Sequence, residues 1–342
     1  MHKKGQVTIK DIAKELGISP STVSKALKDH PDIAPETKKA VKELVEKLNY
    51  KPDPIALSLK IGHSKTIGVI IPEIVHYFFS TVISGIEDEA YNKGYQVIFC
   101  QSNETYEREV RAVETLIAGR VDGILISMSK TTGKFDHFRK ITEYGIPLVF
   151  FDRICEEIET DRVMVDDEEG AFKAVTHLIE TGCTEIIHLA GPQNLRIGLE
   201  RKNGYTRALT LSGLPVKVEN IILCDNSEIA NVVVPELLKR KKIPDGIFAV
   251  NDLTAAETIK IIKSAGLKVP QDISVVGFTS GMISDLTDPP LTSVEQHGYE
   301  IGRESVKLLI DRIENKISVD FITKVIKTEL IIKKSSGKFM CP

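Results

Sequence analysis

Apolar residues recur at helical spacing near the start of the chain, in two segments separated by a glycine. The segments span residues 8–16 and 19–27, and Gly17 permits the left-handed turn that ends the first. Thr8 precedes Asp11 by three residues, which is the spacing of a capping box. The pattern predicts two capped helices joined by a tight turn, a helix-turn-helix motif.

The second of these helices has a polar face suited to DNA. Ser19 is expected to cap it, and Pro20 occupies its first turn, where a missing N–H has no consequence. Its outward side chains are short hydroxyls and one cation, which suit phosphates and base edges in a major groove. A small helical hairpin with a solvated face is the alternative. The caps and the turn favour DNA binding.

A third apolar stripe predicts a helix from Pro35 to Asn49 that closes a three-helix core. Its inward positions are Val41, Leu44, Val45 and Leu48. Residues 1–60 hold 12 Lys and Arg against 8 Asp and Glu, whereas the whole chain has a net charge of −3. This asymmetry supports a nucleic-acid partner for the N-terminal part, although the local excess is modest.

Beyond residue 65, short apolar runs bounded by Gly or Pro alternate with amphipathic stretches. The runs are 66–71, 96–100, 123–127, 147–151, 185–190, 246–250 and 274–278. The amphipathic stretches include 82–93, 107–118, 170–181 and 254–265. This alternation predicts an α/β fold of parallel, doubly wound sheets with ligand crevices at the strands' carboxyl ends. About 270 residues exceed one compact core, so we expect two subdomains.

Several motifs together point to a family. The N-terminal part reads, in order, TIKDIA, GISPSTVSKAL, PETKKAV and LNYKP. Weaker matches follow at residues 66–72, 121–124, 201–205, 251–252 and 289–292. In this order they resemble the lactose-repressor/galactose-repressor (LacI/GalR) family of bacterial transcription regulators, over about residues 6–333.

The resemblance implies roles for the second helix. Pro20, Ser21 and Lys25 match family positions that read base edges, and Thr22 and Ser24 match positions that mostly hold phosphates. The full set of predicted DNA-contacting residues is Thr8, Ser19, Pro20, Ser21, Thr22, Ser24, Lys25, Ala56 and Leu59.

Residues 53–60 match a hinge helix that forms on operator DNA. Leu59 matches a leucine that is wedged into the minor groove and kinks the duplex, with an ordinary linker leucine as the alternative. Asp53 and Leu57 depart from the family, which usually has an asparagine and a basic residue there. Pro54 suits only a first helical turn. These departures put the hinge's contribution to affinity in doubt.

The resemblance also implies a type I periplasmic-binding-protein clamshell behind an all-α headpiece. We expect a headpiece at 1–50, a hinge and linker at 51–64, an effector-binding and dimerisation domain at 65–335, and a tail at 336–342. With crossings near 163, 292 and 321, the N-subdomain covers about 65–162 and 293–320, and the C-subdomain about 163–292 and 321–335.

A small-molecule effector is then expected between the lobes, contacted by strand-end loops. Aromatic faces in the segment 76–79 are suited to stacking on a sugar ring, and Arg201 matches an arginine that clamps ligand oxygens. Packing in the lobe core is the alternative for 77–79, and mutual pairing is the alternative for Asp152 and Arg153. The expected effector-contacting residues are His76, Tyr77, Phe78, Ser127, Asp152, Arg153, Arg201, Asn226, Asn251, Asp252 and Thr279.

One departure bears on the effector's chemistry. Many sugar-responsive relatives carry an aspartate where this chain has Thr279, and Asn226 stands near a position that is often aromatic. Arg153 and Arg201 with fewer acids suggest an anionic ligand, such as a sugar acid or sugar phosphate, as an alternative to a neutral sugar.

The sequence contains few signatures of enzymes, metalloproteins, or secreted and membrane proteins. Phosphate-binding glycine loops, paired metal-ligand spacings and C-x-x-C motifs are missing from the sequence, so we expect no cofactor, no metal and no enzymatic activity. Five scattered cysteines suit a reducing cytoplasm, and neither a signal peptide nor a membrane-length apolar run is recognisable. A solute-binding receptor of a transport system and a sugar-modifying enzyme are the rival classes.

The sequence is therefore interpreted as a cytoplasmic, nucleoid-associated repressor controlled by a carbohydrate-type effector. We expect it to bind a palindromic operator as a homodimer or a tetramer, because one helix-turn-helix reads only one half-site.

Overall fold

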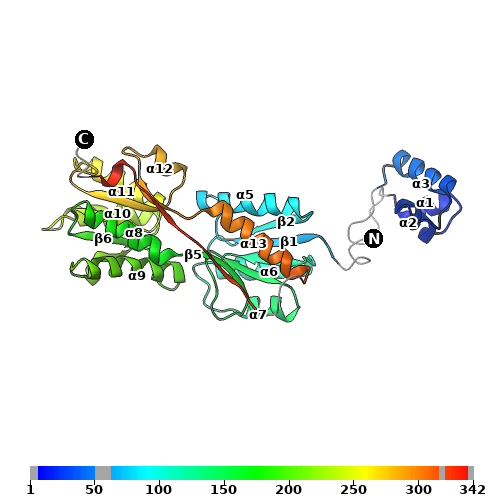
Figure 1. The fold of residues 1–342 in the computed structure, drawn as a ribbon, viewed down its shortest axis with the longest axis horizontal. Helices are drawn as coiled ribbons and strands as arrows, with labels where there is room; N and C mark the ends of the chain where they lie inside the picture. The colour runs from blue at the N-terminus through cyan, green and yellow to red at the C-terminus, as the bar shows by residue number, and fades with distance from the viewer. Residues whose placement is uncertain (1–6, 51–62, 316–319, 338–342) are drawn as a thin grey trace. The chain divides into compact units, whose positions relative to one another are not determined.

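The computed structural model describes residues 7–50, 63–315 and 320–337. The chain divides into two compact units, residues 1–65 and 66–342 (Figure 1). The expected hinge helix at 53–60, with Ala56 and Leu59, lies outside the described residues.

Three short helices make up the described part of the first unit. They are α1 (Ile9–Glu15), α2 (Pro20–Leu27) and α3 (Pro35–Lys47). Ile12, Val23, Ala26 and Val41 are fully buried together at their centre. The predicted helix-turn-helix is confirmed, as is the third helix, which ends two residues before the expected Asn49.

Two six-stranded sheets form the frame of the second unit, one in each lobe. The N-lobe strands are β1 (Thr66–Ile71), β2 (Gln96–Gln101), β3 (Gly123–Ile126), β4 (Leu148–Phe151), β5 (Asp161–Val165) and β11 (Thr323–Ile326). The C-lobe strands are β6 (Ile186–Ala190), β7 (Ile221–Leu223), β8 (Gly246–Ala249), β9 (Ser274–Thr279), β10 (Thr292–Glu295) and β12 (Glu329–Ile331).

Strand order in both sheets is that of a doubly wound fold. The N-lobe sheet runs β11-β5-β4-β3-β1-β2 and is parallel throughout. The C-lobe sheet runs β12-β10-β9-β8-β6-β7, and only β12 is antiparallel to its neighbour. The strands' carboxyl ends therefore gather at one edge of each sheet, where the loops carry polar residues.

Helices cover both faces of each sheet, with a separate core beneath each layer. In the N-lobe, α5 (Tyr77–Asn92) and α13 (Gly298–Ile313) cover one face, and α6 (Tyr106–Ala118) and α7 (Asp136–Glu143) cover the other. In the C-lobe, the two layers are α8 (Asp167–Glu180) with α9 (Arg196–Leu211), and α10 (Ser227–Leu238) with α11 (Asp252–Ser264). The short elements are α12 (Met282–Leu286), η1 (Val218–Asn220) and η2 (Lys334–Ser336).

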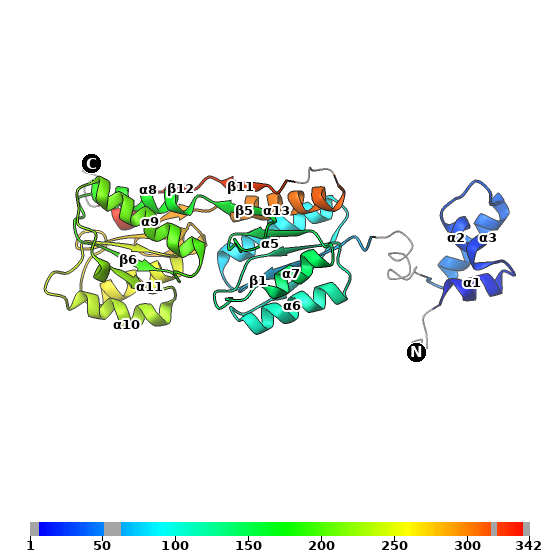
Figure 2. The same ribbon diagram turned by 90° about the horizontal axis from the view of Figure 1, so that it is seen from below.

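Three segments carry the chain between the lobes. They follow β5, follow β10, and connect β11 to β12, which Figure 2 shows running along both lobes. The expected crossings near 163, 292 and 321 each come a few residues too early. The strand β5 pairs with β4 in the N-lobe, β10 pairs with β9 in the C-lobe, and β11 pairs with β5 in the N-lobe, and the chain crosses only after each of them.

Within the described ranges, no helix has the length and apolar character that crossing a membrane requires.

Candidate DNA-binding and effector-binding sites

The start of α2 carries a cluster of exposed hydroxyl groups. Ser19 caps the helix by accepting a hydrogen bond from the Thr22 amide at 3.1 Å. The Ser19 hydroxyl also lies 2.7 Å from that of Ser21 and 2.8 Å from that of Thr22. Pro20 occupies the first turn. A helix N-terminus with such hydroxyls is a favourable place for a phosphate or a base edge.

Other side chains of α2 divide between its buried and exposed faces. Lys25 is about half exposed, and its ammonium group lies 3.5 Å from the Asp32 carboxylate. An exposed pair of this kind is weak, so Lys25 remains available to another anion. Ser24 is half-buried beside the fully buried Val23, which makes it a less accessible contact than Lys25.

Thr8 has a structural role that competes with its predicted DNA contact. Its hydroxyl donates to the Asp11 carboxylate at 2.7 Å, and its backbone N–H donates to the same oxygen at 2.8 Å. The Asp11 amide completes the capping box. The side chain of Thr8 is therefore already engaged in starting α1.

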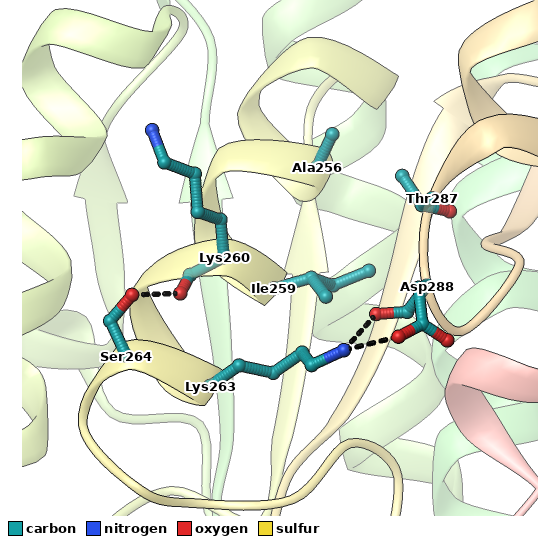
Figure 3. Close-up of a pocket in the computed structure, with 7 residues that line it drawn as sticks. All are labelled: Ala256, Ile259, Lys260, Lys263, Ser264, Thr287 and Asp288. Atoms are coloured by element: carbon teal, nitrogen blue, oxygen red, sulfur yellow. Dashed lines mark hydrogen bonds and ion pairs between the residues drawn. The ribbon is translucent and has the colours of Figure 1, made fainter.

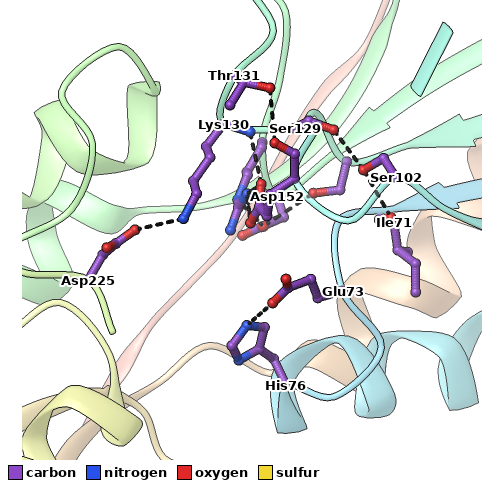
Figure 4. A network of polar contacts seen from close by, with 12 residues as sticks. Ile71, Glu73, His76, Ser102, Ser129, Lys130, Thr131, Asp152 and Asp225 are labelled. Atoms are coloured by element: carbon purple, nitrogen blue, oxygen red, sulfur yellow. Dashed lines mark hydrogen bonds and ion pairs between the residues drawn. The ribbon is translucent and has the colours of Figure 1, made fainter. Parts of the chain in front are cut away.

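Polar side chains in the N-lobe gather where β1 to β4 end (Figure 4). Asp152 follows β4 in a left-handed conformation, with φ of 58°, which is unusual for a residue other than glycine. Its carboxyl group is buried and accepts a hydrogen bond from the Ser127 hydroxyl at 3.4 Å. Burial raises the pKa of Asp152 to about 6, and the neighbouring Arg153 opposes that shift. Strain and a perturbed pKa in one residue are typical of functional sites.

Arg153 is bound on its other side by a residue that the sequence did not single out. Its guanidinium donates to both carboxylate oxygens of Glu104, at 2.7 and 2.8 Å. The Glu104 carboxylate also accepts from the backbone N–H of Lys130 at 2.9 Å. Glu104 thus joins the loops that follow β2, β3 and β4.

Three contacts bridge the two lobes on this side of the second unit. The ammonium group of Lys130 lies 3.3 Å from the Asp225 carboxylate, as Figure 4 shows. The side-chain amide of Asn194 donates to the backbone carbonyl of Lys130 at 2.8 Å. Arg196 pairs with Glu156. The expected site therefore lies at a closed junction between the lobes.

Arg201, expected to clamp a ligand, is fixed within the C-lobe. It donates to Asp167 at 2.7 Å and to the carbonyl of Val250 at 2.6 Å. Its guanidinium carbon lies 3.8 Å from the centre of the Phe278 ring, and only 5% of the residue is exposed. Burial raises the pKa of the Asp167 carboxyl group, and the charge of Arg201 counters that shift.

Four more C-lobe residues are predicted to contact the effector. In the structure they cap helices or form hydrogen bonds between loops. Asn226 and Asn251 are the N-caps of α10 and α11. Asp252 is buried and accepts from the Gly281 amide at 3.0 Å and from the Ser293 hydroxyl. Thr279 donates to the side chain of Gln296 at 3.2 Å. Asn226, Asn251 and Thr279 are half-buried.

The aromatic segment after β1 divides between core and surface. Phe78 and Phe79 belong to the N-lobe core, which supports the alternative interpretation for both. Tyr77 is 42% exposed, and its ring lies against Gly281 of the C-lobe. His76 is hydrogen-bonded to the Glu73 carboxylate at 2.8 Å. Stacking on a ligand ring is thus limited here to Tyr77 and His76.

Two cavities lie in the second unit, and the smaller is lined by the predicted effector residues Tyr77, Phe78 and Thr279. One of about 320 Å³ lies beside Tyr77 and Thr279, bordered by Glu295 and His297. The other, of about 470 Å³, lies between α11 and Thr287–Asp288 (Figure 3). There Lys263 donates to the Asp288 carboxylate at 2.5 Å. Among the described residues, no group of three or more His, Cys, Asp and Glu is placed to hold a metal ion.

Comparison with known proteins gives matches over nearly the whole chain. Residues 8–53 match the family of bacterial regulatory proteins, lacI family. Residues 64–333 match the periplasmic binding proteins and sugar binding domain of the LacI family. Together these two matches span the headpiece and both lobes.

Individual relatives match with similar coverage. The transcriptional repressor PurR of Vibrio atlanticus is 33% identical over 313 residues, covering 90% of this chain and 92% of PurR. Catabolite control protein A of Priestia megaterium is 34% identical over 316 residues, covering 92% and 94%. The solved structure of the regulator CelR with cellobiose has a TM-score of 0.74 at 26% identity, covering 96% of this chain and all of that one.

Proposed function

The chain belongs to the lacI family of bacterial regulatory proteins. We propose that it is a repressor whose affinity for operator DNA is controlled by a carbohydrate-type effector. Family membership makes it a DNA-binding transcription regulator rather than an enzyme, since its relatives include transcriptional repressors. A transport receptor shares the two-lobed fold but has no use for the N-terminal helix-turn-helix.

The main support for DNA binding is the cluster of hydroxyl groups at the start of α2. Ser21 and Lys25 are exposed on this helix, while Val23 and Ala26 secure it to the core. We assign base-edge contacts to Ser21 and Lys25, and phosphate contacts to Ser19 and Thr22. Thr8, Pro20 and Ser24 act mainly by starting or packing the helices.

The polar groups at the junction of the lobes support the proposal of effector binding there. Asp152, Ser127 and Arg153 offer hydrogen-bonding groups at the N-lobe strand ends, and Asp225 and Asn251 lie on the C-lobe side. A ligand held between the lobes shifts the protein's equilibrium between its open and closed forms. Solved relatives include a regulator bound to cellobiose and one with bound ribose, which supports a sugar-type effector for this chain.

Two copies are needed for tight and specific recognition. One α2 reads one half-site, whereas a homodimer places two such helices on a palindrome about one helical turn apart. Further pairing into a tetramer is compatible with this arrangement. A regulator of this kind works in the bacterial cytoplasm, on the nucleoid.

Operator selection tests the DNA-binding part. The full-length protein is incubated with random-sequence duplexes, and bound DNA is amplified and sequenced over several rounds. We expect an enriched palindrome whose half-sites lie about one helical turn apart. Ser21→Ala and Lys25→Ala should lower affinity for it, whereas Lys14→Ala, on the exposed side of α1, should leave affinity almost unchanged. No enrichment, or equal effects of all three substitutions, would refute the assignment.

Thermal unfolding tests the effector part. Ligand that binds only the folded protein raises the melting temperature as its concentration exceeds the dissociation constant. Neutral sugars, sugar acids, sugar phosphates and nucleobases are screened on the wild type and on Ser127→Ala. We expect a sugar to stabilise the wild type and to stabilise Ser127→Ala less. A hit confined to nucleobases would contradict the carbohydrate assignment.

A further inference from the structure

Glu104 holds the guanidinium group of Arg153 with both oxygens of its carboxylate. The two residues are 49 positions apart, at the ends of β2 and β4, and the bonds measure 2.7 and 2.8 Å. Arg153 is 15% exposed and Glu104 is 11% exposed. Both bonds come from one nitrogen of Arg153, Nη1. Charge-assisted hydrogen bonds of this kind are stronger than neutral ones, and limited exposure reduces screening by solvent.

The local structure fixes Glu104 in this position. Asn103 and Glu104 have φ values of 49° and 57°, so two successive residues other than glycine adopt the left-handed conformation. Such strain persists only where the surroundings hold the backbone. Here the Glu104 carboxylate accepts from the amide of Lys130, and its carbonyl accepts from the hydroxyl of Thr131. Glu104 is therefore positioned toward Arg153 by the loop after β3.

The other cations of this junction also have carboxylate partners. Lys130 pairs with Asp225 at 3.3 Å, Arg196 with Glu200 at 2.7 Å, and Arg201 with Asp167 at 2.7 Å. An anionic ligand would have to displace one of these carboxylates or lie beside it. The anionic alternative raised by the sequence rests on Arg153 and Arg201 with fewer acids than in sugar-responsive relatives, but each of these arginines has a carboxylate partner here.

We propose that Glu104 determines the charge of the effector: by neutralising Arg153, it makes the junction accept neutral, hydroxyl-bearing ligands and reject anionic ones. The inference rests on the proposed function, because it takes the strand ends as the effector site. Hydroxyl groups suit the Asp152 carboxyl at the end of β4, whose present partner is the fully buried Ser127 hydroxyl. Glu104 acts through Arg153 and is a specificity-determining residue.

Substitution of Glu104 provides the test, with inorganic sulfate as the probe. Glu104→Gln keeps the size of the side chain and one acceptor oxygen for the Lys130 amide, but it leaves the charge of Arg153 unbalanced. Thermal unfolding of the lobes is followed against sulfate, with chloride at matched ionic strength as reference. We expect Glu104→Gln to bind sulfate at least about tenfold more tightly than the wild type, the size of a neighbouring-charge effect.

Two further variants define the origin of that gain. Glu73→Gln removes a carboxylate of the same junction that pairs with His76 rather than with an arginine, and it should behave like the wild type. The double variant Glu104→Gln with Arg153→Gln should lose the gain. If Glu104→Gln does not fold, Glu104→Ala is measured in the same way.

Three outcomes would overturn the proposal: no gain over Glu73→Gln, a gain that survives removal of Arg153, or wild-type binding of gluconate that depends on Arg153. Operator binding by the wild type is measured on the same preparation. Its failure would refute the proposed function, whereas the sulfate result concerns the role of Glu104 alone.

Discussion

The ammonium group of Lys130 and the carboxylate of Asp225 lie 3.3 Å apart, and this ion pair joins the N-lobe to the C-lobe across 95 positions of sequence. Lys130 is 36% exposed and Asp225 is 17% exposed. The loop that carries Lys130 is itself secured by the buried Glu109, which accepts from the Ser129 amide at 2.7 Å. The junction is thus held by a modest surface contact that is anchored in a rigid loop.

Loss of the Lys130 charge should loosen the junction without unfolding either lobe. Because the pair is partly exposed, Lys130→Met is expected to cost no more than about 1 kcal/mol. Hydrogen exchange measured by mass spectrometry should become faster in the segments 129–132 and 193–196. Lys134→Met, which alters an exposed lysine in the same region, is the control. Unchanged exchange in Lys130→Met would mean that the pair does not hold the lobes.

Gly281 is expected to tolerate no side chain, because Tyr77 occupies the space. A Cβ atom at Gly281 would lie 2.4 Å from a carbon of the Tyr77 ring. Gly281→Ala should therefore lower the melting temperature of the second unit by several degrees, and Tyr77→Ala in the same chain should restore part of the loss. Gly133→Ala is the matched control, since its Cβ would have no neighbour within 4 Å. Additive effects of the two substitutions would contradict the contact.

The Asp152 carboxyl makes stability depend on pH. Burial raises its folded-state pKa from 3.8 to about 6, so the folded protein favours the protonated form. The stabilisation is complete below pH 4 and is lost as pH rises through 6, by roughly 3 kcal/mol at most. Asp152→Asn should therefore be more stable than the wild type at pH 7.5, with a clearly smaller gain at pH 4.5, measured by urea unfolding. An equal difference at both pH values would exclude this account.

The capping box at the start of α1 should support DNA binding from a distance. Asp11→Ala removes the acceptor of two hydrogen bonds from Thr8, at an expected cost of about 1 kcal/mol to the headpiece. Amide exchange in α1 should rise, and operator affinity should fall more steeply with temperature than in Lys10→Ala. Equal behaviour of the two variants would show that the cap is dispensable.

The sequence predicts the elements that have a strong local pattern. The run 66–71 coincides with β1, and Thr8 and Ser19 cap the helices they were expected to cap. The strands β5, β7 and β10 to β12 are absent from the sequence prediction. Length is not the reason, because β3, β4 and β8 are equally short, but the missed strands have no distinct apolar run of their own. Their places depend on pairing with strands distant in the chain.

The effector site was predicted less completely than the headpiece for a related reason. Asp152 and Arg153 follow β4, Arg201 lies on α9, and the family resemblance marks all three. Glu104 and Asp225 belong to loops with no distinctive pattern, and they meet Arg153 and Lys130 only because the strand order brings those loops together. Arg201 was expected to face a ligand, but its partners Asp167 and Val250 could not be read from spacing.

Specific DNA recognition through α2 is the central claim, and fluorescence anisotropy tests it most directly. The full-length protein is titrated onto its selected palindrome and onto a scrambled duplex of equal length, at one salt concentration. We predict at least about a thousandfold preference for the palindrome, with Lys25→Ala reducing that preference and Lys14→Ala preserving it. Equal affinity for the two duplexes, or an unchanged preference in Lys25→Ala and Ser21→Ala, would contradict the account.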